Sequence, residues 1–268
     1  MKRDKHLGKC AICGEIRKLT YEHIPPKSAF NSQPTKQYNA FQSLGTTNKP
    51  WEFDGLKYIN MQKGKGVYSL CRECNNNTGA WYGKDYCEFI QKLGNTIMHT
   101  KEFTNEHIQV EAVDIYPLRI LKQILSMFLS INKDYELPEL SDFVKDKNSK
   151  KLDKSKYKIC IYLYKGTVTK QIPLCAVGNI LTGSMKFVSE IADFPIGIIL
   201  YVNSDSNLKT EGTDITDFCS FDYNEKCDVS IPLSYKEVNT PIPCDFRTKD
   251  EVIKNIEENK KFIKDKNL

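Results

Sequence analysis

Two Cys-x-x-Cys pairs constrain this chain more than any other feature of its sequence. Cys10 and Cys13 form the first pair, Cys71 and Cys74 form the second, and 57 residues separate the pairs. Each pair makes a turn that directs two sulfur atoms at one ion, and four thiolates complete a tetrahedral zinc site. A redox role is disfavoured, because neither pair lies beside a βαβ pattern. The sequence therefore predicts one structural Zn²⁺ bound by residues far apart in the chain.

The residues beside the cysteines predict two short strands and a helix. A β-prone run covers 19–24 and stops at Pro25-Pro26, because proline cannot donate to a sheet ladder. A second short strand, at 67–70, leads to the second cysteine pair. Apolar spacing over 79–93 predicts a helix, with the asparagine run at 75–77 capping its start. The predicted order is cysteine pair, strand, strand, cysteine pair, helix.

The remainder of the chain predicts a second α+β unit. We expect a long apolar helix at 118–131, β runs at 159–164, 185–188 and 196–202, and a charged helix at 249–264. We interpret 95–112 as a connection. The predicted fold class is α+β, with an N-terminal unit of residues 1–100 and a C-terminal unit of residues 101–268.

Composition and charge limit the compartment and the partners. The N-terminal residues are charged and lead into no apolar run, and no segment approaches the length of a membrane span, which predicts a cytoplasmic protein without a membrane partner. The first 100 residues contain 15 Lys and Arg against 8 Asp and Glu, a net charge of +7. The remainder has 24 against 26, a net charge of −2. A basic half beside a near-neutral half favours a polyanionic partner for the first unit.

The tripeptide Glu22-His23-Ile24 supplies candidate catalytic groups between the two cysteine pairs. A neutral imidazole can take a proton from water, and a carboxylate beside it can bind a hard divalent ion. The same tripeptide recurs at Glu106-His107-Ile108, but without neighbouring cysteines or following prolines, so we interpret the second copy as non-catalytic. Hydrolytic chemistry is therefore expected at His23.

Taken together, these motifs resemble the HNH endonuclease superfamily in its zinc-stapled form. The resemblance rests on C-x2-C-G, then E-H-I-P-P-K-S, then L-C-x2-C-N-N-N-T-G, over roughly residues 8–95. It implies a ββα-metal fold, in which a hairpin and one helix surround a single catalytic ion. It also implies a metal-dependent endonuclease that hydrolyses phosphodiester bonds, with DNA as the expected substrate.

The resemblance implies a role for each of three residues. His23 is the expected general base, and Glu22 and Asn75 are the expected ligands of a catalytic Mg²⁺ or Mn²⁺, with Asn76 as an alternative to Asn75. A zinc ion on four thiolates has no open position, so catalysis needs this second cation. Oxygen donors from a carboxylate and an amide suit such a hard ion.

The sequence departs from the family pattern between the two strands. In the family, an asparagine usually lies about five residues before the third cysteine, and this chain has Gly66 at that position. Another residue must therefore hold the loop that follows His23, here called the histidine loop, and Asn60 is the candidate. The segment between the strands is also longer than usual, which leaves room for substrate recognition. The basic residues expected to contact nucleic-acid phosphates are Lys18, Lys27, Lys63, Lys65 and Arg72.

Two other functions remain open on the sequence. A zinc-dependent nucleic-acid-binding module without catalysis would need neither Glu22 nor His23, so the presence of both disfavours it. Alternatively, residues 101–268 could form an oligomer interface, or a sensor or docking domain that regulates a nuclease, as in bacterial or phage defence systems. That second interpretation rests on analogy alone.

Overall fold

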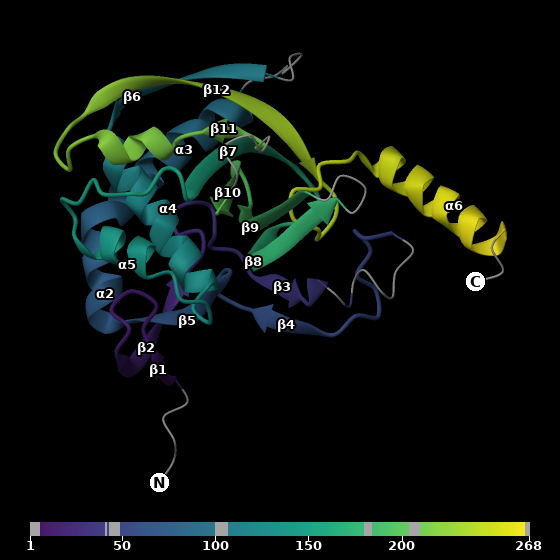
Figure 1. Cartoon of the computed structure of the whole chain (residues 1–268), viewed down its shortest axis with the longest axis horizontal. Helices are drawn as coiled ribbons and strands as arrows, with labels where there is room; N and C mark the ends of the chain where they lie inside the picture. The colour runs from purple at the N-terminus through teal and green to yellow at the C-terminus, as the bar shows by residue number, and fades with distance from the viewer. Residues whose placement is uncertain are drawn as a thin grey trace, which may run out of the picture.

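The N-terminal unit is a three-stranded antiparallel sheet followed by a long helical segment. Its strands are β1 (Leu7–Lys9), β2 (Ile16–His23) and β5 (Gly66–Cys71), in the order β1-β2-β5. The helical segment follows β5 directly as α2 (Arg72–Thr78), a π-helical stretch η1 (Gly79–Gly83) and α3 (Lys84–His99). The computed structural model describes residues 6–40, 42, 49–99, 107–179, 184–203 and 210–265, and Figure 1 shows the chain.

The helix begins earlier than the sequence indicated. It starts directly after Cys71, so the asparagine run at 75–77 lies inside it and does not cap its start. The π-helical stretch contains Gly79 and Gly83, both within the predicted helix. The early start matters for the site, because it places Cys74 in the first turn of a helix that begins at the zinc cluster.

The insertion between β2 and β5 contains a small hairpin. Its strands are β3 (Thr35–Tyr38) and β4 (Tyr58–Met61), which pair antiparallel. The rings of Tyr38 and Phe53 stack with their centroids 4.6 Å apart. The described part of this insertion is therefore folded, as the sequence predicted from its interspersed aromatic residues.

A seven-stranded sheet dominates the C-terminal unit. Its strands are β6 (His107–Ile115), β7 (Tyr157–Gly166), β8 (Lys170–Asn179), β9 (Ser184–Ala192), β10 (Ile196–Val202), β11 (Thr213–Asp214) and β12 (Cys227–Val238). The order is β6-β12-β7-β10-β9-β8, with β11 also paired to β7, and only β12 and β7 are parallel among these pairs. The predicted connection at 95–112 is wrong, because it contains the end of α3 and the start of β6.

Helix α4 (Pro117–Ile131) joins the two units through a shared core. Thirteen of its 15 residues are buried, and it packs against β5, η1 and α3 as well as against β8. One cluster of buried apolar side chains includes Leu70 of β5, Ile90 of α3 and Ile198 of β10. The apolar helix predicted at 118–131 is thus confirmed, and it forms the packing surface for both units.

The remaining helices lie at the edges of the molecule. They are α5 (Pro138–Lys145), a 3₁₀ turn η2 (Thr216–Ser220) and α6 (Lys249–Asp265). In Figure 1, α6 projects away from both sheets, and its Val252 is buried near its start. The predicted charged C-terminal helix is confirmed. Among the described helices, none has the length and apolar character needed to cross a membrane.

Candidate zinc site and catalytic centre

The four cysteines of the two pairs meet in one cluster. Their Sγ atoms all lie within 4.8 Å of one another, and those of Cys13 and Cys71 are 4.0 Å apart. A tetrahedral ion with Zn–S bonds of about 2.3 Å requires sulfur–sulfur distances of about 3.8 Å. The cluster therefore fits one zinc ion, and the predicted zinc staple is compatible with the structure.

Hydrogen bonds within the cluster favour a thiolate at Cys10. The Cys74 thiol donates to Cys10, the backbone amide of Cys71 donates to the same sulfur at 3.3 Å, and together these bonds lower the pKa of Cys10 to about 4. The same arrangement raises the pKa of Cys74. Since thiolates are the metal ligands, the cluster already carries one ligand in its binding form at neutral pH, and zinc binding would release the other protons.

Glu22 is a desolvated carboxyl group without a partner. Its side chain makes no hydrogen bond or ion pair with any other residue that the structure describes. Burial raises the pKa of Glu22 to about 7. Glu22 is half-buried, and a carboxylate that has lost part of its hydration is stabilised by a cationic partner. The position therefore suits a carboxylate that binds a cation.

Asn75 lies against β2 on the same face as Glu22. Its Nδ2 donates to Thr20 Oγ1 at 2.9 Å, and Thr20 Oγ1 donates in turn to the carbonyl of Leu70 at 2.9 Å. Thr20 and Glu22 are two residues apart in one strand, so their side chains leave the same face. This chain of hydrogen bonds fixes the amide and leaves Asn75 Oδ1 without a donor in the described part of the chain.

Asn76 has a different environment from Asn75. It is exposed, and it lines a shallow hollow whose other lining residues do not include Glu22. Those residues are Arg17, Lys18, Cys71, Arg72, Glu73 and Asn77. The contact with Thr20 thus distinguishes the two neighbouring asparagines.

His23 ends β2, and its ring is held by the segment before β5. The ring Nε2 lies 3.0 Å from the carbonyl oxygen of Lys63, so Nε2–H donates and Nδ1 is the acceptor nitrogen. The ring also packs edge-on against Tyr21, with centroids 5.1 Å apart. Because Tyr21 and His23 share one face of β2, His23 leaves the strand end on the face opposite to Glu22.

Asn31 holds the histidine loop, the role that the sequence suggested for Asn60. It is buried, and its Nδ2 donates to the carbonyls of Pro25 at 2.6 Å and Lys65 at 2.7 Å. Its Oδ1 accepts from the Lys65 amide at 2.7 Å. The prediction for Asn60 is wrong, because that residue is exposed on β4 and opposes Lys36 of β3. Its place within the loop after the histidine was the only sequence signal for Asn31.

Two glycines allow the segment before β5 to approach this loop. A Cβ at Gly66 would overlap the carbonyl oxygen of Glu22. A Cβ at Gly64, whose φ is +96°, would overlap the carbonyl oxygen of Asn31. Any larger residue would push the backbones apart. This close approach explains why glycine occupies position 66, where the family resemblance places an asparagine.

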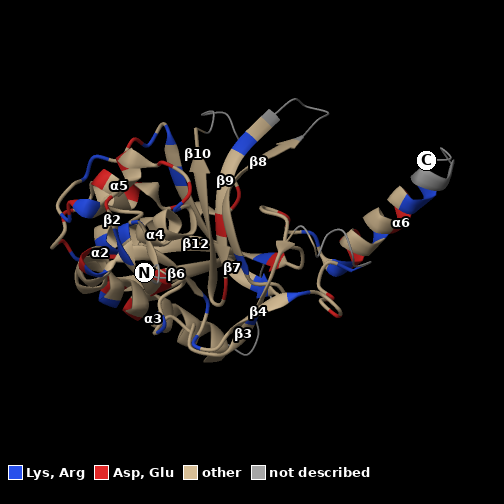
Figure 2. Ribbon diagram, turned by 90° about the horizontal axis from the view of Figure 1, so that it is seen from below, with Lys and Arg blue, Asp and Glu red and all other residues tan. Residues whose placement is uncertain are grey.

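The five basic residues expected at phosphates differ in their surroundings. Lys18, Lys27, Lys63 and Arg72 are exposed, and Figure 2 shows the basic positions on β2 and α2. Lys65 is half-buried, and its Nζ lies 2.5 Å from Asp193 Oδ2, so its charge is already neutralised within the protein. The exposed four are the better placed for phosphate contacts.

The histidine of the second Glu-His pair belongs to no metal-binding group in the described part of the chain. His107 is the exposed first residue of β6 and opposes Ser234 of β12, while Glu106 lies outside the described residues. Comparisons of the chain with protein-family models, with curated proteins and with solved structures find no match.

Proposed function

We propose that the N-terminal unit is a metal-dependent nuclease of the ββα-metal type that hydrolyses phosphodiester bonds, with DNA as its substrate. The observation that carries the proposal is Glu22, a half-buried carboxyl group without a partner among the described residues, directly before a histidine whose ring is hydrogen-bonded. The neighbouring cysteine cluster supports the proposal, because its four cysteines come from the turn between β1 and β2, from the end of β5 and from α2, which would let one zinc ion hold the strands against the helix.

Glu22 and Asn75 are the proposed ligands of a catalytic Mg²⁺ or Mn²⁺. Their carboxylate and amide oxygens are hard donors, and two protein ligands leave room for water and phosphate oxygens. When bound, such an ion neutralises charge that develops on the phosphate. The contact with Thr20 favours Asn75 over Asn76. The four thiolates of the zinc site leave no open position, so that site is structural.

His23 is the proposed general base. Its Nε2 donates to the Lys63 carbonyl, which leaves Nδ1 to take a proton from water. The resulting hydroxide attacks phosphorus, and the bond from phosphorus to the leaving oxygen breaks. The side chains of Glu22 and His23 project from opposite faces of β2 at its end. We therefore expect the scissile phosphate to lie across the end of the strand, within reach of both side chains. Lys27 follows this end in sequence, the backbone of Lys63 contacts the His23 ring, and both lysines are exposed for phosphate contacts.

The test is cleavage of supercoiled plasmid and of single-stranded DNA by the full chain, with Mg²⁺ or Mn²⁺ and with EDTA. We expect cleavage only with the added ion, in protein whose retained zinc is checked by elemental analysis. Glu22→Gln should reduce cleavage to the EDTA level, whereas Glu52→Gln, at an exposed glutamate in the insertion, should cleave like the parent. DNA binding without any cleavage, in folded protein with full zinc content, would instead support a non-catalytic binding module.

A further inference from the structure

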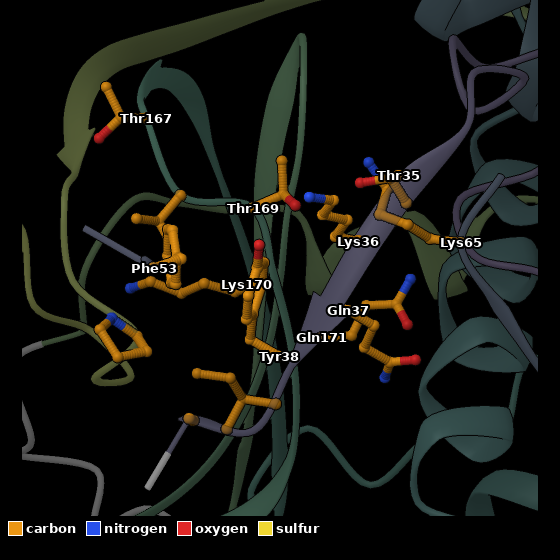
Figure 3. Close-up of a pocket in the computed structure, with 14 residues that line it drawn as sticks. Thr35, Lys36, Gln37, Tyr38, Phe53, Lys65, Thr167, Thr169, Lys170 and Gln171 are labelled. Carbon is orange, nitrogen blue, oxygen red and sulfur yellow. The ribbon is translucent and has the colours of Figure 1, made fainter. Parts of the chain in front are cut away.

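A pocket of about 320 Å³ lies between the insertion hairpin and the C-terminal sheet (Figure 3). Residues 35–38 of β3 form one wall, and residues 167–172, at the start of β8 and in the turn before it, form the other. Both strands are at an edge of their sheet. The volume is at the small end of the range for small-molecule sites, about 300–1,000 Å³. The pocket therefore suits a ligand of roughly the size of one nucleotide.

The charges in this pocket favour a ligand with a single phosphate. Three lysines line it, but Lys65 is paired with Asp193, and Lys170 is buried with its Nζ 3.4 Å from Glu190 Oε2. Lys36 has no carboxylate partner among the described residues, and its Nζ lies over a tyrosine ring at 4.3 Å from the centroid. One uncompensated cation matches one phosphate better than a triphosphate.

The uncharged lining has the groups that recognise a base and a sugar. Tyr38 and Phe53 are a stacked aromatic pair, and aromatic rings provide surfaces on which bases stack. Gln37 leaves β3 on the face opposite to Tyr38 and so lies away from this aromatic surface (Figure 3). The hydroxyls of Thr35 and Thr169 add further hydrogen-bonding groups to the walls.

Two residues of the pocket also hold the histidine loop. The backbone of Lys65 bonds to Asn31 and accepts from the Ile24 amide at 2.9 Å. Gln171 donates from Nε2 to the Ile24 carbonyl. Since Ile24 directly follows His23, the pocket adjoins the loop that carries the proposed catalytic base.

We propose that this pocket binds one nucleotide, either a free mononucleotide or an unpaired nucleotide of a substrate strand. The second source rests on the proposed nuclease function, whereas the first does not. Both share the same chemistry, namely a base against the aromatic pair and one phosphate near Lys36, which leaves β3 on the same face as Tyr38.

The experiment is isothermal titration of the full-length, zinc-loaded His23→Ala protein, in which cleavage does not interfere with binding. The probes are the 5′-mononucleotides, ribose 5-phosphate, a DNA duplex with one unpaired nucleotide and the same duplex fully paired. We expect binding of a mononucleotide or of the duplex with the unpaired nucleotide. Tyr38→Ala should weaken it by about tenfold or more, and Lys36→Met by a similar factor. Gln109→Leu, on β6, is the control and should bind like the parent.

The outcomes separate the two sources and the two proposals. Pocket-dependent binding of a mononucleotide identifies a free nucleotide, and pocket-dependent binding of the unpaired duplex alone identifies the substrate strand. If no probe binds better than ribose 5-phosphate or the paired duplex, the assignment is overturned. It is also overturned if Tyr38→Ala and Lys36→Met proteins with the parent's thermal midpoint bind as tightly as the parent. Failure of plasmid cleavage with nucleotide binding intact would overturn the nuclease and leave the pocket.

Discussion

Strands β2 and β10 show how differently the two units are held together. β2 buries one of its eight residues, Leu19, whereas all seven residues of β10 are buried. Burying one large aliphatic side chain contributes about 1.5–3 kcal/mol, so β10 is stabilised by packing to an extent that β2 cannot match. In the N-terminal unit, the four-cysteine cluster takes over that role, and β2 can carry polar groups for chemistry.

The same contrast appears in two desolvated glutamates. Glu190 of β9 accepts from the hydroxyl of Tyr162 at 2.6 Å and from the Cys244 amide at 2.8 Å, and it is paired with Lys170. Glu22 of β2 has none of these partners among the described residues. Glu190 is fully buried and its carboxylate is part of the structure, whereas the half-buried Glu22 has carboxylate oxygens that stay accessible to a ligand. This difference separates the candidate site from the core.

Zinc removal should have the largest effect, and it should act on the first unit. Structural zinc contributes on the order of 10 kcal/mol to the folding of isolated zinc fingers. We expect Cys74→Ser to lose zinc and to lose hydrogen-exchange protection in β2 and β5, while β7 and β10 stay protected. Cys227→Ser, at a single half-buried cysteine of β12, should keep both zinc and protection. Equal protection of β2 with and without zinc would contradict a metal-held unit.

The next prediction compares the two Glu-His pairs of the chain. His23→Ala should lower the rate of DNA cleavage by a factor on the order of 10² to 10⁴, the usual contribution of a general base. Zinc content and the free energy of unfolding should stay near the parent's values, because the ring is half-buried at a strand end. His107→Ala should cleave like the parent. Should His107→Ala be the inactive variant, the catalytic pair has been assigned to the wrong unit.

A smaller effect is expected where the histidine loop meets β5. Asn31→Ala removes three hydrogen bonds and leaves the Pro25 carbonyl and the Lys65 amide without a partner, whereas the Lys65 carbonyl still accepts from the Ile24 amide. The cost is about 1–3 kcal/mol for each group left unpaired. Urea denaturation should show this loss, and cleavage should fall as His23 loses its position. Asn60→Ala is the matched control, and an exposed substitution should change stability by no more than about 0.5 kcal/mol. Equal losses in both variants would remove Asn31 from its positioning role.

The four-cysteine cluster could be predicted from the sequence, because the spacing of the two pairs alone carries the chemistry. The sequence also singled out Glu22, His23 and Asn75, whose roles stay predictions, and Asn75 of α2 is hydrogen-bonded to Thr20 of β2. Asn31 could not be predicted, since its role depends on a backbone 34 residues away that approaches only in the folded chain. The lack of a partner at Glu22 is likewise a property of the tertiary structure.

In the C-terminal unit, the elements that could be predicted are those whose sequences are mostly apolar. The helix at α4 and the strand at β10 are of this kind. Strands β8 and β12 were missed, because each contains a proline, Pro173 and Pro232, which in sequence argues against a central strand. Pro173 is tolerated because β8 is an edge strand. Pro232 is tolerated because it lies in the part of β12 that pairs with β6 alone, before the part that pairs with β7.

The smallest predicted effect tests the C-terminal unit through Lys122, a charged residue inside α4. Its side chain is buried, and its Nζ donates to the carbonyls of Phe143 and Asp146, both at 2.6 Å. Burial lowers the pKa of Lys122 to about 8, below the value of about 10.4 for a lysine in water. Between these two values the unfolded chain binds a proton that the folded chain does not, so stability rises with pH through this window.

We therefore expect the parent to gain about 1 kcal/mol in unfolding free energy between pH 7 and pH 9, relative to Lys122→Met, which lacks the titrating group. Urea denaturation of zinc-loaded protein at both pH values measures the difference. Lys145→Met, at the exposed end of α5, should keep the parent's pH dependence. If Lys122→Met keeps it as well, the buried ammonium does not set the pH response. The C-terminal core would then hold the charged Lys122 ammonium without the loss of unfolding free energy that its burial implies.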